Sequence, residues 1–308
     1  MPTPLFLSSG DLIADRRYDF ARDLQLRGDL VAAADLMEQA IEQAPNFASA
    51  WFALGELRQQ LNQHGTAIAA YKKACEADPE DRHGAKLRLM RLGVECISEM
   101  PPAYVRSLFD QYAPRFDKAL LEHLDYRGPE ILLKAVLSAC HAAHRPAFFK
   151  RCLDLGCGTG LAAREFGPNV DEFIGVDLSP GMIEQARKTK LYARLDVADM
   201  VQGLTTEPDA SADLVIAADA VIYLPDLAPL AIGAARVLKP GGLFAFTTET
   251  HDGSGVIIGA GFRYAHGPDH IRGAIASAGM ALCSLESAST RNENNMPVAG
   301  LVVVARKS

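Results

Sequence analysis

Arg151-Cys-Leu-Asp-Leu-Gly-Cys-Gly-Thr-Gly160 is the stretch of sequence that decides the fold. Its first five residues are mostly apolar and suit a buried strand, and residues 161–166 then have a helical pattern. Between them, Gly156, Gly158 and Gly160 let the backbone turn sharply and let a ligand lie directly against peptide groups. A glycine loop between a strand and a helix predicts a nucleotide cradle in a doubly wound α/β sheet.

The spacing of the glycines in this loop distinguishes between the classes of ligand that it could bind. A dinucleotide fingerprint would need a small residue where Leu161 stands, and a P-loop would need Gly-Lys-Ser/Thr, which is absent. The remaining pattern, D-x-G-x-G-x-G, starts at Asp154 and resembles the first motif of class I methyltransferases, which bind S-adenosylmethionine (SAM). The resemblance implies that the cofactor is SAM and that Asp154, Gly156, Gly158 and Gly160 bind it. A NAD-dependent oxidoreductase remains the alternative at this point.

Asp177 ends the next apolar run, residues 171–177. At a strand end opposite the glycine loop, a carboxylate can accept hydrogen bonds from both hydroxyls of a ribose. NAD enzymes carry a similar acid, so Asp177 alone does not exclude them. The segment Val176-Asp-Leu-Ser-Pro-Gly-Met-Ile-Glu-Gln-Ala186 resembles the second methyltransferase motif. This resemblance implies that Leu178 and Met182 are apolar walls of the adenosine pocket.

Acids also end the third and fourth predicted strands, residues 192–199 and 213–219. The resemblance implies that Asp199 contacts the adenine amino group, that Met200 supplies a backbone amide, and that Asp219 lies beside the sulfonium. No N-P-P-Y sequence follows the fourth strand, which argues against methylation of adenine or of glutamine amides.

The most specific motif is Val237-Leu-Lys-Pro-Gly-Gly242, followed by the apolar run 243–246. It resembles class I methyltransferases strongly, and dehydrogenases lack it. The resemblance covers about residues 104–308 and is closest to the predicted methyltransferases that contain tetratricopeptide (TPR) repeats. It implies a doubly wound seven-stranded α/β sheet in which residues 280–288 and 298–306 are the last two strands and the final strand is antiparallel.

Residues 109–117 have the sequence Phe-Asp-Gln-Tyr-Ala-Pro-Arg-Phe-Asp. This resembles the F-D-x-Y-A-x-x-F-D segment that precedes the core of many small-molecule methyltransferases. The resemblance implies a helical lid over residues 103–128, with Tyr112 close to the SAM carboxylate and Phe116 in contact with the cofactor. An amphipathic helix whose aromatic side chains only pack is the alternative.

The first 98 residues have a different, helical pattern with a period of 34 residues. Small residues and proline recur at this spacing: Ala21, Ala33, Ala40 and Pro45 match Gly55, Ala67, Ala74 and Pro79. The second unit resembles the TPR pattern, which implies two repeats and a capping helix over residues 81–92. So short a solenoid is expected to lean on the neighbouring domain, residues 99–308, or on a second subunit. It could bind a peptide or protein partner, or it could be a packing or dimerisation module.

The composition of the chain limits which partners, metal sites and cellular locations are expected. The 308 residues carry a net charge of −7 and no basic run, so nucleic acid is not an expected partner. The six cysteines include no CxxC pair, so we expect neither a disulfide framework nor a metal site. No apolar run has the length of a membrane span, and the N-terminus lacks the features of a signal peptide. A cytoplasmic protein without membrane contact is therefore expected.

Loops at the carboxyl edge of the sheet hold the candidate acceptor-binding residues. Arg263-Tyr-Ala-His266 resembles an R-Y-A-H stretch of the same TPR-linked group, so His266, Tyr264 and Arg263 are the candidate catalytic residues, with His251 as a further candidate base. We expect Arg263, His266 and Arg291 to converge on a small, anionic methyl acceptor. The alternative is a protein-modifying enzyme or SAM-binding scaffold that recruits a polypeptide through its TPR groove.

Overall fold

The computed structural model describes residues 5–308, apart from the side chains at positions 119 and 121–123. The chain divides into two compact units between Leu108 and Phe109, here named the repeat unit and the sheet unit. Helix α6 (Pro102–Tyr112) runs across this division, and the predicted domain boundary after residue 98 falls just before it. No helix in the described residues has the length and hydropathy needed to cross a bilayer.

The repeat unit consists of two helical hairpins and a further short helix. Its helices are α1 (Leu12–Leu26), α2 (Leu30–Gln43), α3 (Ala48–Gln60), α4 (His64–Ala77) and α5 (Ala85–Arg91). Small residues stand at the helix crossings as expected: Ala21 and Ala33 are fully buried, and a Cβ atom on Gly55 would lie 2.5 Å from a ring carbon of Tyr71. The capping helix starts later than predicted, because Asp81 has a positive φ of 50° and its carboxylate accepts hydrogen bonds from the first amides of α5.

The sheet unit contains the predicted seven-stranded sheet, in the order β3-β2-β1-β4-β5-β11-β8. β11 is antiparallel to both of its neighbours, as the sequence predicted, and the other neighbouring strands are parallel. The strands are β1 (Phe149–Leu155), β2 (Val170–Asp177), β3 (Tyr192–Val197), β4 (Ala212–Ala217), β5 (Leu238–Thr250), β8 (Met280–Ser287) and β11 (Gly300–Lys307).

Two short hairpins were not predicted. β6 (Val256–Ile258) and β7 (Tyr264–His266) are antiparallel to each other, and β7 also pairs with the end of β5. β9 (Asn292–Glu293) and β10 (Met296–Pro297) form a separate pair in the loop before β11.

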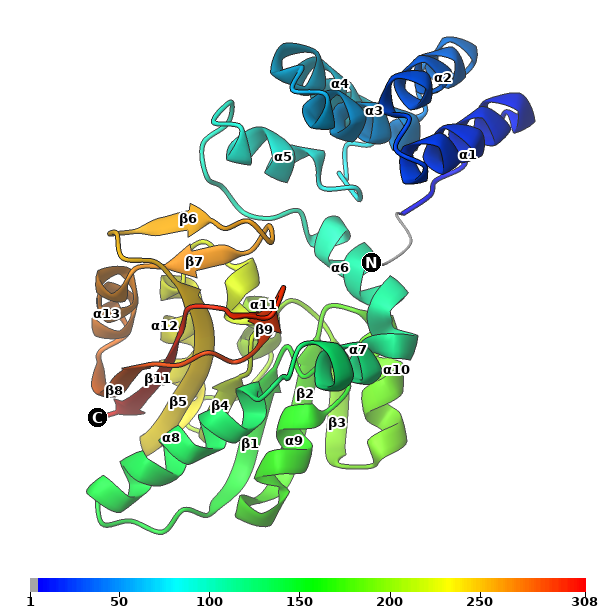
Figure 1. The fold of residues 1–308 in the computed structure, drawn as a ribbon. Helices are drawn as coiled ribbons and strands as arrows, with labels where there is room; N and C mark the ends of the chain where they lie inside the picture. Colours follow the sequence, from blue (N-terminus) through cyan, green and yellow to red (C-terminus); the bar gives the residue numbers. More distant parts are fainter. Residues whose placement is uncertain (1–4) are drawn as a thin grey trace. The chain divides into compact units, whose positions relative to one another are not determined.

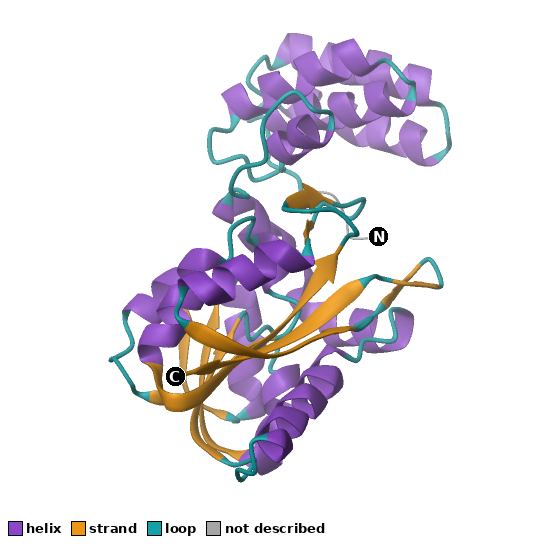
Figure 2. Ribbon diagram, turned by 90° about the vertical axis from the view of Figure 1, so that its left-hand side faces the viewer, coloured by secondary structure: helices purple, strands orange, loops and turns teal. Residues whose placement is uncertain are grey.

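Helices cover both faces of this sheet (Figures 1 and 2). One apolar cluster joins the sheet to α8 (Gly128–Ala142) and α9 (Leu161–Phe166). Another joins it to α11 (Met200–Thr205), α12 (Ala228–Val237) and α13 (Pro268–Ser277). Because both faces are covered, the inner strands are almost continuously apolar, as β4 shows with four successive buried residues, 214–217. The helices of the unit after α6 are η1 (Ala113–Arg115), α7 (Phe116–His123), α8 (Gly128–Ala142), α9 (Leu161–Phe166), η2 (Gly167–Asn169), α10 (Pro180–Thr189), α11 (Met200–Thr205), η3 (Val221–Tyr223), α12 (Ala228–Val237) and α13 (Pro268–Ser277).

Candidate functional site

The glycine loop joins β1 to α9, and its glycines serve different purposes. Gly156 has φ +67°, and a Cβ atom there would lie 2.4 Å from Cβ of Ala220, so the close approach of the loop to the residue after Asp219 requires glycine. Gly158 has φ +54°, but a Cβ atom on it would meet only a ring carbon of Phe116, at 3.7 Å. Gly156 is therefore needed for packing, whereas a Cβ atom on Gly158 would make only one ordinary contact, with Phe116 of the lid.

A substitution at Gly156 should lower stability for this reason. We expect Gly156→Ala to reduce the free energy of unfolding by about 2–4 kcal/mol, since it combines a backbone strain of about 1–2 kcal/mol with overpacking against Ala220. Chemical denaturation measures this change. Gly167→Ala is the matched control, because Gly167 has an ordinary φ of −46° and nothing within 4 Å of an added Cβ atom. Equal stabilities of the two variants would contradict the packing role.

Asp177, at the end of β2, holds the glycine loop in place. Its Oδ2 accepts a hydrogen bond from the amide of Gly158 at 2.9 Å, and its Oδ1 accepts one from the amide of Ser179 at 2.8 Å. Burial raises the pKa of this carboxyl to about 6, and the two amide hydrogen bonds oppose that rise. The structure thus brings Asp177 and the glycine loop together, as the sequence predicted.

Asp154 lies beneath the loop, in β1, and is only 1% exposed. Its Oδ2 accepts a hydrogen bond from the hydroxyl of Tyr192 at 2.7 Å, whereas its Oδ1 is buried and has no hydrogen-bond partner among the described residues. Burial raises its pKa to about 7, with a further rise from the charge of Asp177. A buried acceptor without a donor costs about 1–3 kcal/mol, so this atom suits a site completed by a bound molecule.

The raised pKa of Asp154 predicts a pH dependence of stability. In the unfolded chain this carboxyl loses its proton near pH 3.8, whereas in the fold it keeps the proton to about pH 7. The stability that it contributes is therefore present below about pH 4 and is lost as the pH rises to 7, by at most about 4 kcal/mol. Denaturation of the ligand-free protein across this range should show a steeper fall for the wild type than for Asp154→Asn. Parallel profiles would contradict the shift.

The ends of β3 and β4 complete the edge of the candidate site. Asp199 caps α11, because its Oδ1 accepts hydrogen bonds from the amides of residues 201 and 202; β3 therefore ends at Val197, before the predicted end at 199. Met200 lies beside the loop, with its sulfur 3.7 Å from the position of a Cβ atom on Gly156. Of the predicted adenosine walls, Leu178 is half-buried and Met182 is 1% exposed.

Asp219 has a positive φ of 51°, which is unusual for a residue other than glycine and is common at functional sites. Thr247 of β5 fixes it by accepting a hydrogen bond from its amide at 2.8 Å and donating one to its Oδ1 at 2.9 Å. Since Ala220 touches the glycine loop, Asp219 stands next to it at the carboxyl edge of the sheet.

The predicted lid, whose part within the sheet unit is residues 109–128, contacts this edge through aromatic rings. The ring of Phe109 lies 6.0 Å from that of Phe116 and 5.3 Å from that of Tyr223, both edge-to-face. Tyr112 is half-buried, and burial raises its pKa while the charges of Arg115 and Arg263 oppose the rise. The predicted lid residues therefore lie on the glycine-loop side of the molecule.

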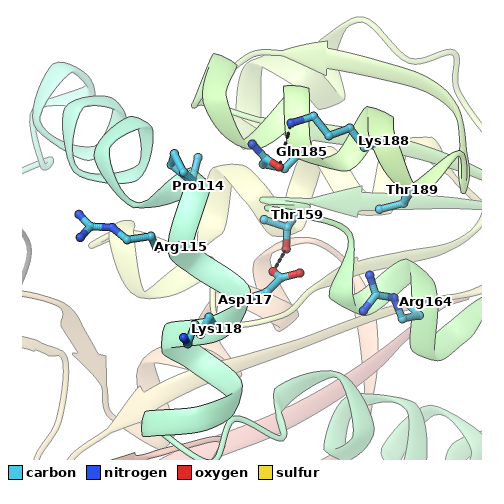
Figure 3. A pocket seen from close by; sticks show the side chains of 10 residues that line it. Pro114, Arg115, Asp117, Lys118, Thr159, Arg164, Gln185, Lys188 and Thr189 are labelled. Carbon is cyan, nitrogen blue, oxygen red and sulfur yellow. Dashed lines mark hydrogen bonds between the residues drawn. The ribbon is translucent and has the colours of Figure 1, made fainter.

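Two acids of the same motif were quoted from the sequence without a role. Asp110 accepts hydrogen bonds from the hydroxyl of Ser179 at 2.5 Å and from the amide of Gly181 at 3.0 Å, so it joins the lid to the start of α10. Asp117 accepts a hydrogen bond from the hydroxyl of Thr159 in the glycine loop (Figure 3). The sequence signal for these acids was the repeated Phe-Asp pair, at residues 109–110 and 116–117. Only the fold shows which groups they contact.

A cavity of about 460 Å³ lies beside the contact between Asp117 and Thr159 (Figure 3). Its walls come from η1, the start of α7, α9 and α10, and include Arg164 and Lys188. None of the predicted cofactor-binding residues lines it. The buried carboxyl groups of Asp154 and Asp177 lie instead at the strand edge beside Gly158.

The two predicted arginines meet in a cluster of carboxylates. Arg291, whose side chain is 6% exposed, contacts Asp219 at 3.3 Å, Glu293 at 3.1 Å, and also Glu249. Arg263 contacts Glu249 at 2.5 Å and also Glu293. Two guanidinium groups thus face three carboxylates, and the arginines stand at the predicted edge already paired.

His266 and Tyr264 are not placed as the sequence predicted. His266 is fully buried, with Nδ1 2.7 Å from the hydroxyl of Thr248 and Nε2 2.8 Å from the carbonyl oxygen of Leu224. Burial lowers its pKa to about 4. A general base needs an accessible nitrogen and a higher pKa, so the geometry favours a structural role. Tyr264 is likewise fully buried, because R-Y-A-H forms strand β7 rather than an open loop.

Tyr126 was not singled out from the sequence. The segment around it is held to the loop before β9, since the amide of Arg127 donates to the carbonyl of Thr290 and the amide of Asn292 donates to that of Leu124, both at 2.7 Å. Burial and the charge of Asp219 raise the pKa of the Tyr126 phenol well above its usual value. This phenol therefore belongs to the surroundings of Asp219.

Comparisons with known proteins identify the family of this chain. A methyltransferase domain model matches residues 153–246, and a tetratricopeptide repeat model matches residues 48–81. Human methyltransferase-like protein 27 is 33% identical over 170 residues, which are 54% of this chain and 67% of that protein. The chain belongs to the SAM-dependent methyltransferases. The cofactor of this methyltransferase is SAM, as the sequence predicted.

Two further proteins show how far the similarity extends. Aklanonic acid methyltransferase DauC from Streptomyces sp. (strain C5) is 32% identical over 151 residues, 47% of the methyltransferase described here and 64% of DauC. The crystal structure of the [4+2]-cyclase SpnF has a TM-score of 0.53 and 17% identity, and it covers 68% of this chain and 97% of SpnF. That likeness concerns the fold alone. The methyltransferase thus spans about two thirds of the length of the sequence relatives, which leaves its acceptor to be inferred.

Proposed function

We propose that this methyltransferase transfers the methyl group of SAM to a small molecule at the carboxyl edge of the sheet, next to Asp219. The main support is the buried carboxylate of Asp177, which is fixed by the amide of Gly158 in the glycine loop, where Phe116 of the lid lies nearby. Such a carboxylate beside a glycine loop suits the two hydroxyls of a ribose. The unpartnered Oδ1 of Asp154 is a second buried acceptor in the same place.

The proposed roles follow from the order of these groups along the edge. Asp177 would bind the ribose, Asp199 and the amide of Met200 the adenine, and the glycine loop with Tyr112 the methionine part. Bound SAM supplies an electrophilic methyl carbon, so the protein mainly has to orient the acceptor and exclude water. The rings of Phe109, Phe116 and Tyr223 are suited to the exclusion of water.

The acceptor is proposed to be small and anionic, on the basis of Arg263 and Arg291. The name of the relative DauC, aklanonic acid methyltransferase, also contains an acid. In this structure, however, both guanidinium groups are bound to Glu249 and Glu293. An anionic acceptor would therefore have to displace one of these glutamates from an arginine, and a guanidinium can bind a carboxylate or phosphate with two hydrogen bonds.

Metabolite extracts incubated with the protein and methyl-labelled SAM test this proposal. Mass spectrometry should show a labelled small molecule that carries a carboxylate or another anion. The Gly158→Val variant is the control, since it should not bind SAM. Label on polypeptides alone would contradict a small-molecule acceptor, and an uncharged or cationic product would contradict the role proposed for the arginines.

A further inference from the structure

The cluster of Arg263, Arg291, Asp219, Glu249 and Glu293 contains one carboxylate more than it has guanidinium groups. Its two arginine side chains are largely buried, at 18% and 6% exposure. Two of the three carboxylates are enough to balance their charges. The cluster can therefore lose one carboxylate and become neutral, whereas loss of an arginine would leave buried carboxylates without a counter-charge.

Glu293 is the carboxylate that can leave this cluster most easily. Its side chain is 35% exposed, whereas those of Glu249 and Asp219 are both 12% exposed. Glu249 lies in β5 and is paired across the sheet with both β11 and β7. Glu293 lies in the two-residue strand β9, which pairs with β10 outside the main sheet. Rotation about its side-chain bonds can turn the carboxylate into solvent while the backbone of β9 stays in place.

The carboxylate of Glu293 bridges the two arginines through a single oxygen. Its Oε1 accepts a hydrogen bond from Nε of Arg291 at 3.1 Å and another from Nη2 of Arg263. Its Oε2 accepts no hydrogen bond from the described residues. A free carboxylate is not tied to the backbone, so it can place one oxygen on each guanidinium group, which gives stronger charge-assisted hydrogen bonds. Exchange of Glu293 for such a ligand thus improves the contacts of the arginines and leaves the charge of the cluster unchanged.

We propose that Glu293 occupies, in the free protein, the place of a carboxylate of the methyl acceptor, and that the acceptor displaces it from Arg263 and Arg291. This inference rests on the proposed function and narrows the acceptor to a carboxylic acid. Glu293 then acts as a specificity-determining residue. A carboxylate replaces every contact that Glu293 gives up, whereas an uncharged or cationic molecule replaces none and leaves Glu293 bound to the arginines.

Acetate is a suitable probe for this exchange in the whole chain. In Glu293→Ala, acetate should raise the melting temperature relative to sodium chloride at the same ionic strength, because it fills the vacated place between the arginines. We expect this variant to bind acetate at least about tenfold more tightly than the wild type does. Glu172→Ala is the matched control: Glu172 is also an exposed glutamate beside a less exposed arginine, Arg151, at 3.3 Å, but near the start of β2. Acetate should stabilise this control no more than the wild type.

The labelling assay with metabolite extract and methyl-labelled SAM tests the exchange on the acceptor itself. The extract is diluted serially, and the extract concentration that gives half-maximal labelling of the small-molecule product is compared between variants. Glu293→Gln should lower this concentration at least about tenfold, because it removes a charged group that competes with the acceptor for the arginines. Glu249→Gln should not lower it, since Glu249 holds the arginines in place.

Three results would overturn the proposal. They are a Glu293→Ala variant that binds acetate no better than Glu172→Ala, a Glu293→Gln variant whose half-maximal extract concentration is not below that of the wild type, and a decrease seen for Glu249→Gln alone. Circular dichroism establishes that every variant is folded. If the wild type labels no small molecule, the proposed function fails, while the acetate measurement still decides whether a free carboxylate can replace Glu293.

Discussion

Gly158→Val should abolish SAM binding while the protein stays folded. The valine side chain would fill the space between the loop and Phe116, and its branched Cβ opposes the positive φ of 54° at this position. We expect the affinity for SAM to fall at least about a hundredfold, which corresponds to about 2.7 kcal/mol. Isothermal titration calorimetry measures the affinity, and circular dichroism establishes that the fold persists.

The variant Gly279→Val distinguishes two effects of Gly158→Val, the filling of the space beside Phe116 and the strain of a branched residue at a positive φ. Gly279 has a similar φ of 67°, nothing lies within 4 Å of an added Cβ atom, and it stands between α13 and β8. This variant should lose some stability and still bind SAM. Unchanged SAM binding by Gly158→Val would place the cofactor elsewhere.

Asp177→Ala should lower the affinity for SAM at least tenfold. It removes the proposed acceptor for the ribose hydroxyls, and charge-assisted hydrogen bonds of this kind contribute about 1.5–3 kcal/mol each. It also removes the acceptor that holds the amides of Gly158 and Ser179, so the loop should become less ordered. Calorimetry with SAM measures the combined effect.

Two further variants distinguish loss of the ribose acceptor from loss of order in the glycine loop. Asp177→Asn keeps one acceptor oxygen for the loop amides, so its affinity should lie between those of the wild type and the alanine variant. Asp171→Ala removes an exposed carboxylate from the same strand and should leave the affinity unchanged. The assignment of Asp177 fails if all three variants bind SAM as tightly as the wild type.

The features that the sequence predicted correctly are those whose physical causes lie close together in the chain. The glycine loop needs glycine because of local backbone geometry and one close neighbour. The acid that ends β2 must reach the same edge of the sheet once parallel strands are assumed. The antiparallel final strand was implied by the family resemblance, together with two alternating apolar runs at residues 280–288 and 298–306. Local pattern and topology together therefore sufficed for the sheet and for the position of Asp177.

The acceptor side was predicted less well, because it depends on contacts between distant segments. The R-Y-A-H stretch was taken for an open loop, but pairing with the end of β5 turns it into β7 and buries His266. The partners of Arg291 lie up to 72 residues away, so no local pattern shows that three carboxylates already surround the arginines. The contact between Tyr192 and Asp154 spans 38 residues and was missed for the same reason.

The hydrogen bonds of Asp110 bear on the rate of turnover. They join the lid to residues 179 and 181, and Ser179 is in turn hydrogen-bonded to Asp177, so the lid and the proposed ribose site share one short chain of hydrogen bonds. If SAM binds at Asp177 as proposed, we expect the spent cofactor to leave only after these hydrogen bonds have broken. We therefore expect its release, rather than the methyl transfer itself, to limit the rate of turnover.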